Sequence, residues 1–391
     1  MSVLWVTTEP PDRNLGGGSI RQAHLLDALA AQAEVTLLLY GSRLEDQVTK
    51  AGLANLIEVP GSTRRPERGP VRERWRRLRE ALLERDPPEV TDYRAIRADL
   101  EPWLGKVGEH DVVIVEHPGL APLVTMRRSE RWMLTMHNVG SGTLDQYAAQ
   151  STGRWRWLRR RQARQARAFE RWALRAFDLV ISVSEQDARL LPGPTAVVPN
   201  GVDPDRFIPT PLPRTPGLVL VGTLHYLPNV EGATWFAEEV LPLIRERFPE
   251  ATLTLVGRSP TDEVLGLRSI RGVEIHADVP DVRPHLLAAR VSVVPLQIGT
   301  GTRLKALESF AAYRPVVGTS VGLAGLEARS REHALVADEA APFAECVVEL
   351  LSDDELASNL VAQARRLVES RYSWQRIGEG FAEVVLSEQA P

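Results

Sequence analysis

A glycine-rich segment that carries two basic residues is the strongest candidate for chemistry in this sequence. It reads GTGTRLKALE at 299–308, directly after the apolar run 291–294. Glycines let the backbone approach a ligand closely, and the first amides of a following helix favour an anion. Arg303 and Lys305 add two cations to the first turn of that helix, where they oppose its dipole. A bound phosphate would explain this arrangement; the alternative is a strand-to-helix turn with exposed basic side chains.

The composition strengthens the case for Lys305. The chain has only three lysines against 44 arginines, so a compact ammonium in a glycine-rich segment is unusual. Glu308 follows Arg303 by five residues. An acid at this position can accept hydrogen bonds from the two hydroxyls of a ribose, as in dinucleotide-binding folds. The alternative for Glu308 is an ion pair with a neighbouring base on the helix surface.

The elements that position these residues alternate between short apolar runs and helical stretches. Near-continuous apolar runs are typical of parallel strands that helices cover on both faces. The pattern begins again after a proline-rich stretch at 209–216, which predicts an α/β protein with two Rossmann-like βαβ domains facing a central cleft. We expect strands at 3–7, 35–39, 112–115, 132–136, 179–183, 218–221, 252–256, 291–294 and 315–317.

Composition and charge exclude several classes of protein. The 391 residues suggest two or three domains, and a net charge of −4 argues against nucleic-acid binding. Cys346 is the only cysteine, which excludes an internal disulfide framework and a metal site built from cysteines. The histidines show no metal-binding spacing, and we interpret Asp203–Asp205 as a structural turn, so no metal is expected. No run reaches the about 18 apolar residues of a membrane span, and we expect a cytoplasmic protein.

The glycine-rich segment and the residues after it resemble the donor-site signature of family 4 glycosyltransferases with the GT-B fold. The segment RPVV at 314–317 continues that signature. Three further motifs occur in the same order as in the family: VPNGVD at 198–203, VGT at 221–223 and YSW at 372–374. The resemblance covers nearly the whole chain. It implies transfer of a sugar from a nucleotide-diphosphate sugar to an acceptor hydroxyl, with retention of anomeric configuration and without a metal or other cofactor.

The resemblance also implies a division of labour between the domains. We expect an N-terminal acceptor-binding domain at 1–205 and a C-terminal nucleotide-sugar-binding domain at 206–370. A final helical segment at 371–391 is expected to pack back on the N-terminal domain. The implied process is the biosynthesis of a bacterial glycan or glycoside, and the implied partners are a nucleotide sugar and an acceptor that is either lipid-linked or a small molecule.

By this resemblance the donor site lies in the C-terminal domain. Two features depart from the family pattern: Thr300 stands where many members have a first glutamate, and the loop 222–229 lacks their basic pair. The diphosphate is therefore expected to rest mainly on Arg303, Lys305 and helix amides. The predicted donor-binding residues are Gly222, Thr223, Gly299, Thr300, Gly301, Thr302, Arg303, Lys305 and Glu308.

The predicted acceptor side lies in the N-terminal domain. His137 follows the expected strand 132–136, and it matches a family histidine near the donor sugar; its alternative is a structural role. We predict that His137, Arg303 and Lys305 are catalytic, with the two cations stabilising the leaving phosphate. The resemblance places backbone amides of the glycine run near the donor phosphates and acceptor. The predicted acceptor-side residues are Gly16, Gly17, Gly18, Glu116, His117 and Asn138.

Two other functions fit parts of this pattern. A nucleotide-sugar epimerase on the same fold would keep the donor site, and a non-catalytic sugar-nucleotide-binding protein would agree with the missing first glutamate. A dehydrogenase is disfavoured because no GxGxxG follows the first expected strand.

A long basic helix is expected at 154–177. It holds nine arginines and one acid, Glu170, and Trp155 and Trp157 lie near its start. Apolar residues at helical spacing indicate that one face packs on the domain. Aromatic and basic residues together suit an anionic membrane surface, which predicts peripheral contact with the inner face of the membrane. The alternative is a solvated basic face.

Overall fold

The computed structural model describes residues 1–13, 15–61, 96, 98–104, 109–126, 130–191, 193–301 and 303–387. The chain forms two compact units. The first unit comprises Met1–Pro199 and Ile377–Pro391, and the second comprises Asn200–Arg376. Thr302 of the predicted donor site lies outside the described residues.

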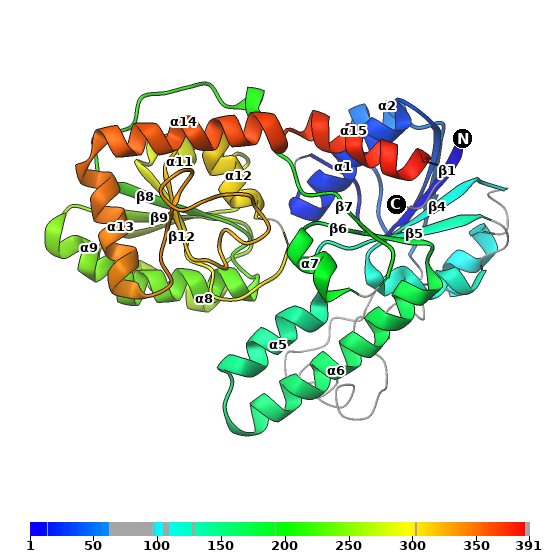
Figure 1. Cartoon of the computed structure of the whole chain (residues 1–391), viewed down its shortest axis with the longest axis horizontal. Coiled ribbons are helices and arrows are strands. Elements are labelled where there is room, and N and C mark those ends of the chain that lie inside the picture. The colour runs from blue at the N-terminus through cyan, green and yellow to red at the C-terminus, as the bar shows by residue number, and fades with distance from the viewer. Residues whose placement is uncertain are drawn as a thin grey trace. The chain divides into compact units, whose positions relative to one another are not determined.

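The described part of the first unit contains a seven-stranded parallel sheet in the order β3-β2-β1-β4-β5-β6-β7 (Figure 1). Its central strands are almost completely buried, as expected for strands with helices on both faces. The strands are β1 Ser2–Thr7, β2 Glu34–Tyr40, β3 Asn55–Val59, β4 Val112–Glu116, β5 Arg131–Thr135, β6 Leu179–Ser182 and β7 Thr195–Val197.

The helices of this unit follow the strand ends. Helices α5 and α6 form an antiparallel pair that follows β5 in the chain (Figure 1). The bounds are α1 Gly17–Ala30, α2 Gln47–Gly52, the 3₁₀ segment η1 Pro118–Met126, α5 Gly140–Gln150, α6 Gly153–Ala176 and α7 Glu185–Leu190. Helix α15, Trp374–Leu386, begins at the end of the second unit and continues into the first.

The second unit contains a six-stranded parallel sheet in the order β10-β9-β8-β11-β12-β13. The strands are β8 Gly217–Val221, β9 Thr252–Gly257, β10 Val273–Ala277, β11 Val291–Val294, β12 Val316–Gly318 and β13 Leu335–Val336. The helices are η2 Pro204–Arg206, α8 Leu227–Trp235, the π-helical turn η3 Phe236–Val240, α9 Leu241–Arg247, α10 Asp262–Gly266, η4 Leu267–Ser269, α11 Arg283–Ala288, α12 Leu304–Ala311, α13 Ala340–Ser352 and α14 Asp354–Arg371.

These two sheets confirm the predicted fold class of paired Rossmann-like α/β units. Each unit has its own aromatic core. In the first unit Trp5 lies against Phe381 with ring centroids 5.6 Å apart. In the second, Phe343 contacts Trp235 and Phe236 edge to face at 5.6 and 5.7 Å. The strand ends that carry the predicted site residues are therefore anchored in well-packed cores.

Candidate functional site

The predicted donor-site residues gather at one edge of the second sheet. Strands β8 and β11 are hydrogen-bonded neighbours, and Gly222 and Gly299 lie in the loops that follow them. Because parallel strands present their carboxyl ends at the same edge, the two loops meet there. Helix α12 starts from the second loop, so the structure brings 222–223 and 299–308 together as the sequence predicted.

Lys305 and Asn229 form the centre of this cluster. The Lys305 ammonium donates to Asn229 Oδ1, and Asn229 Nδ2 donates to the Thr223 carbonyl at 2.8 Å. Gly222 lies directly against both side chains: a Cβ there would be 2.8 Å from Asn229 Nδ2 and 3.0 Å from Lys305 Nζ. Only a residue without a side chain fits beside this pair, which explains the glycine after β8.

Burial sets the charges of this cluster. It is the main cause that lowers the pKa of Lys305 to about 7; the positive charge of Arg303 adds to it, and Glu308 opposes it. Burial also raises the pKa of Glu308 to about 7, against the opposing charges of Arg206 and Lys305. A ligand anion next to Lys305 would therefore favour its charged form.

Arg303 occupies a different place from the one predicted. It is the residue before α12 rather than a member of its first turn, and it is 7% exposed. Its guanidinium donates to the Val321 carbonyl at 3.0 Å and to the Thr300 carbonyl at 2.8 Å. Gly299 and Gly301 have φ of +132° and +89°, which favour glycine. Arg303 thus fixes the shape of the glycine-rich loop.

In the first unit, Glu116 and His137 lie against each other at the carboxyl ends of neighbouring strands. Glu116 ends β4 and His137 follows β5, and His137 Nε2 lies 2.7 Å from Glu116 Oε1. Gly18 lies beside them, because a Cβ there would be 3.6 Å from His137 Cε1 and 3.0 Å from Glu9 Oε2. The structure therefore brings Gly18, Glu116 and His137 together, while Asn138 is exposed.

A buried arginine supports this pair. Arg21 of α1 is 1% exposed and donates to the carbonyls of Val198 and Pro199, each at 2.8 Å. Burial lowers its pKa to about 10, against the charge of Glu116. Although burial opposes its ionisation, Glu116 has a lowered pKa because His137 and Arg21 favour its negative charge. Glu116 is therefore a buried carboxylate between two bases.

His117 has a backbone φ of +79°, and its Nδ1 accepts from the Gly119 amide at 3.1 Å. Burial is the main cause that lowers its pKa to about 4, so it is neutral at physiological pH. The strained backbone and this hydrogen bond turn the chain away from β4 into η1. His117 fixes the strand end that carries Glu116.

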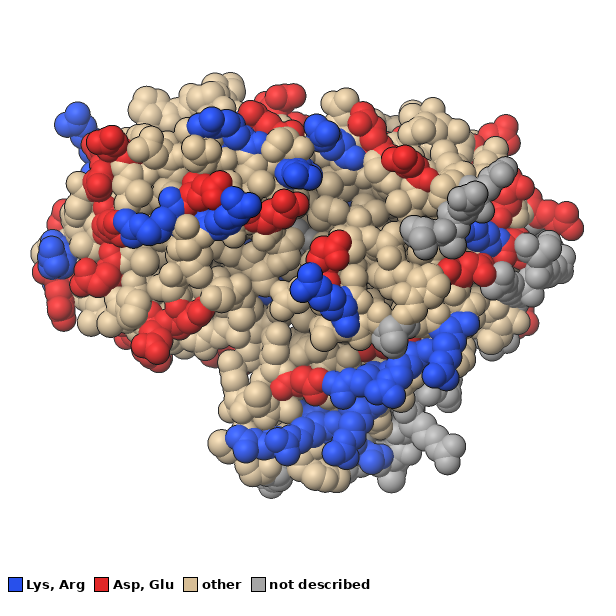
Figure 2. All heavy atoms as spheres, in the orientation of Figure 1, with Lys and Arg blue, Asp and Glu red and all other residues tan. Residues whose placement is uncertain are grey.

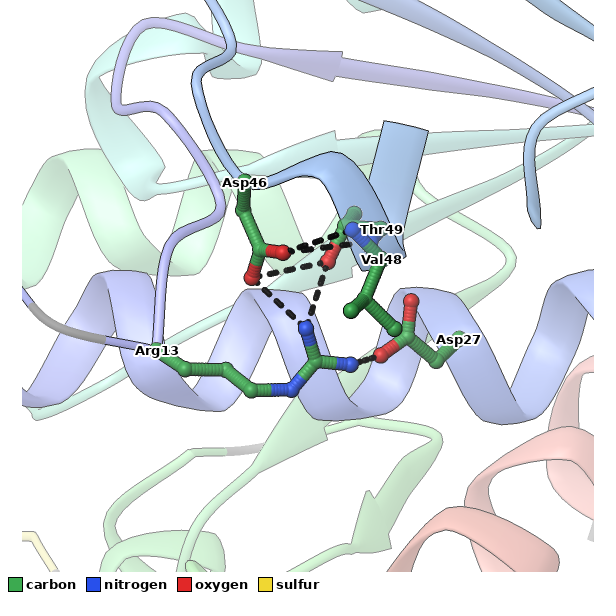
Figure 3. Close-up of polar contacts among 5 residues, drawn as sticks. All are labelled: Arg13, Asp27, Asp46, Val48 and Thr49. Carbon is green, nitrogen blue, oxygen red and sulfur yellow. Dashed lines mark hydrogen bonds and ion pairs between the residues drawn. The ribbon is translucent and has the colours of Figure 1, made fainter. Parts of the chain in front are cut away.

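Arg13 anchors the loop that leads into the glycine run (Figure 3). Its guanidinium lies between Asp27 of α1 and Asp46, the N-cap of α2, with 2.6 Å to Asp46 Oδ2. Although partial burial opposes its ionisation, the pKa of Asp46 is lowered by the Thr49 amide and by Arg13. Gly16 caps α1, and Gly17 and Gly18 belong to its first turn rather than to the loop.

The sequence analysis missed Asn229, Arg21 and Tyr226. Asn229 lies in the first turn of α8, in a segment that the sequence distinguished only by its lack of basic residues, although an amide beside a predicted phosphate-binding lysine is itself a signal. Tyr226 is the residue before α8, and the charge of Arg303 opposes the rise that burial causes in its pKa. Arg21 carries no sequence signal, because it is one of 44 arginines.

In the described part of the chain, no three histidine, cysteine, aspartate or glutamate side chains gather where they could hold a metal ion. Among the same residues no helix has the length and apolar character to cross a membrane.

Comparisons with known proteins agree with this architecture. Residues 15–206 match the family model "Glycosyltransferase Family 4", and residues 215–353 match "Glycosyl transferases group 1". No curated protein sequence matches the chain. The fold is similar to that of sucrose-phosphate synthase from Thermosynechococcus elongatus, with a TM-score of 0.72, 18% identity and 98% of each chain covered.

Two further solved structures are similar over their whole length. HepE from Anabaena has a TM-score of 0.68 at 12% identity, with 98% of this chain and 99% of that chain covered. WaaG, a glycosyltransferase involved in lipopolysaccharide biosynthesis, has a TM-score of 0.66 at 16% identity, with 98% and 100% covered. The fold and the two family models define a GT-B glycosyltransferase. Within that class, the chain belongs to the family 4-like glycosyltransferases of group 1.

Proposed function

We propose that this glycosyltransferase moves a sugar from a nucleotide-diphosphate sugar to an acceptor hydroxyl with retention of configuration and without a metal. The observation that carries the proposal is the half-buried Lys305 ammonium that donates to Asn229, beside Gly222 and at the start of α12. The solved structure of HepE in complex with UDP and glucose supports a nucleotide-sugar donor.

The chemistry follows from the charge that the leaving group develops. As the bond between the sugar's anomeric carbon and the phosphate oxygen breaks, negative charge collects on the diphosphate. Preorganised cations and amides stabilise such charge. Lys305 and the amides of the 299–301 loop supply them, and Arg303 holds that loop through the Thr300 and Val321 carbonyls.

The remaining residues of the proposed site bind and orient the nucleotide sugar. The acceptor oxygen bonds to the anomeric carbon on the face that the nucleotide leaves, and its proton passes to the departing phosphate, so no protein base is assigned. Glu308, whose pKa is raised to about 7, accepts or donates at the ribose hydroxyls. His137, fixed through Nε2 by Glu116, positions the donor sugar.

Two variants test the donor site. Lys305→Ala removes a charge-assisted hydrogen bond, typically about 1.5–3 kcal/mol, so nucleotide-sugar affinity or turnover should fall roughly tenfold or more. Lys50→Ala, at an exposed lysine of α2, is the matched control.

Candidate nucleotide sugars are first ranked by thermal stabilisation, since a ligand that binds the native state raises its melting temperature. NMR of the product then reports the anomeric configuration. Equal affinity and turnover in both variants would refute the phosphate assignment.

Metal independence has its own test. Cations and amides already surround the proposed diphosphate position, so we expect activity to survive EDTA. Complete loss in EDTA with recovery in Mg²⁺ or Mn²⁺ would contradict this part of the proposal and leave the Lys305 prediction to be judged separately.

A further inference from the structure

A cavity of about 390 Å³ lies between α6 and α7 in the first unit. This cavity is distinct from the candidate site around Glu116 and His137, because neither residue lines it. The lining side chains are Arg167, Glu170, Arg171, Leu174, Arg189, Leu190 and Leu191.

The charges around this cavity do not balance. Glu170 is the only carboxylate of the lining, and its oxygens accept from the Ser141 amide at 2.9 Å and the Ser141 hydroxyl at 2.5 Å. Arg167 is paired with Asp145 at the surface. Within the described parts of the chain, Arg171 and Arg189 have no ion pair. Two guanidinium groups that form no ion pair with a described residue therefore line one cavity.

The shape and polarity of the cavity narrow the class of ligand. Leu174 and Leu191 are 3% and 4% exposed and form an apolar wall, whereas Leu190 is 52% exposed at the rim. Arginine matches phosphate oxygens with paired N–H donors, and two unpaired arginines match a dianion better than a single carboxylate. Figure 2 shows that basic side chains gather over α6, which favours the approach of anions to this face.

We propose that this cavity binds the phosphate group of a phosphorylated molecule. Arg171 and Arg189 hold the phosphate oxygens, and Leu190 contacts an apolar part of the same ligand. The site belongs to the first unit, whereas the proposed diphosphate position belongs to the second, so the two can be tested separately. The phosphate can come from a soluble phosphomonoester or from a lipid headgroup, and the experiment distinguishes them.

Protection from arginine modification locates the ligand directly. The full chain is treated with phenylglyoxal alone, with glycerol 1-phosphate, with phosphatidic acid vesicles, and with sodium chloride at matched ionic strength; modified sites are mapped by mass spectrometry. We expect Arg171 and Arg189 to be protected at least several-fold more than Arg164, an exposed arginine of α6 outside the cavity. Protection by glycerol 1-phosphate identifies a soluble source, and protection by vesicles alone identifies a lipid. No protection, or equal protection of Arg164, overturns the proposal.

Matched variants give a second measurement. The double variant Arg171→Gln, Arg189→Gln should bind the protecting probe at least tenfold more weakly, since each change removes a charge-assisted hydrogen bond. Arg164→Gln, Arg175→Gln removes the same charge from exposed positions of α6 outside the cavity and should bind as the parent does. Both are made in a Lys305→Ala background, so that phosphate binding at the proposed donor site does not contribute. Equal weakening by both double variants would show general charge attraction and overturn the site.

Discussion

Lys305 lies in surroundings that differ from those of a surface lysine. Burial is the main reason that its pKa falls from 10.5 to about 7, and Arg303 adds to the effect. Between these two values the unfolded chain binds a proton that the folded chain does not, so this residue makes stability rise with pH across that window. Below about pH 7 the folded protein carries a half-buried ammonium, and a bound anion would offset the free-energy cost of that charge.

Lys305→Met should therefore change stability in a pH-dependent way. Methionine removes this charge. The free energy of unfolding of the variant minus that of the parent should therefore be largest near pH 7 and should fall toward about pH 9.5. The unpaired Asn229 Oδ1 costs the same at both pH values. Urea unfolding at the two pH values measures the difference. Lys50→Met, at an exposed site, should show no such trend; a Lys305→Met difference that is flat or grows with pH would contradict the buried charge.

The residue types in the sequence predict part of the donor site but not all of it. Glycines, one rare lysine and an acid within ten positions predicted the 299–308 cluster, because few other roles need that combination. The same reasoning put Arg303 in the helix, whereas its bonds to the Val321 and Thr300 carbonyls hold it outside α12. A sequence shows that a guanidinium is present but not which carbonyls lie within reach, since Val321 comes from another loop.

At the scale of elements, the predicted strands are the inner strands of both sheets, and the four that were missed are the edges. Strands β3 and β7 border the first sheet, and β10 and β13 border the second. Inner strands are buried on both faces and read as continuous apolar runs. Edge strands are short or partly exposed, as in NLIEV of β3, so their composition resembles that of loops.

Helix α6 spans Gly153–Ala176, close to the predicted 154–177. Leu158, Ala163 and Ala166 are buried along one face, whereas Trp155 and Trp157 are 45% and 59% exposed. The two tryptophans thus lie outside the packing face, among arginines that Figure 2 shows gathered over this helix. Arg159 is different, because its guanidinium lies 4.9 Å from the Tyr147 ring and holds α6 to α5.

We propose that this end of α6 contacts an anionic membrane surface, and co-sedimentation with vesicles tests it. Each basic residue near an anionic leaflet contributes about 1 kcal/mol, so binding should require anionic lipid and weaken with salt. Replacing Trp155, Trp157 and Arg160 with serine should release the protein while sparing the Arg159–Tyr147 contact. Arg247→Ser, Arg271→Ser removes exposed charges from the second unit and should bind normally. Absence of binding at low salt would leave α6 as a solvated face.

At the scale of the whole molecule, the chain crosses between its units twice. It leaves the first unit after Pro199 and re-enters at Ile377. Near these crossings, Val202 exchanges backbone hydrogen bonds with Tyr372 and Trp374 at 2.8 and 3.0 Å. A Cβ at Gly201 would lie 2.8 Å from the Trp374 ring, so the segments NG at 200–201 and YSW at 372–374 pack directly against each other.

Helix α15 then completes the core of the first unit. Phe381 is fully buried against Trp5, and Arg131 of β5 donates to the Ser387 carbonyl at 2.5 Å. Gly378 lets the helix approach α1 closely, since a Cβ there would be 2.5 Å from Ala28 Cβ. Residues 377–387 therefore stabilise the unit that holds β1.

Phe381→Ala should consequently destabilise the first unit selectively. Truncating a buried phenylalanine costs typically about 3–5 kcal/mol, and here the cavity would open beside Trp5 of β1. Hydrogen exchange should quicken in β1, α1 and β4 and stay unchanged in β8, β9 and β11. Phe343→Ala is the matched control, because that ring is equally buried in the core of the second unit and should produce the reverse pattern. If Phe381→Ala instead loosened both sheets equally, the two units would unfold as one, and α15 would stabilise the molecule through cooperativity between units rather than through the core around Trp5.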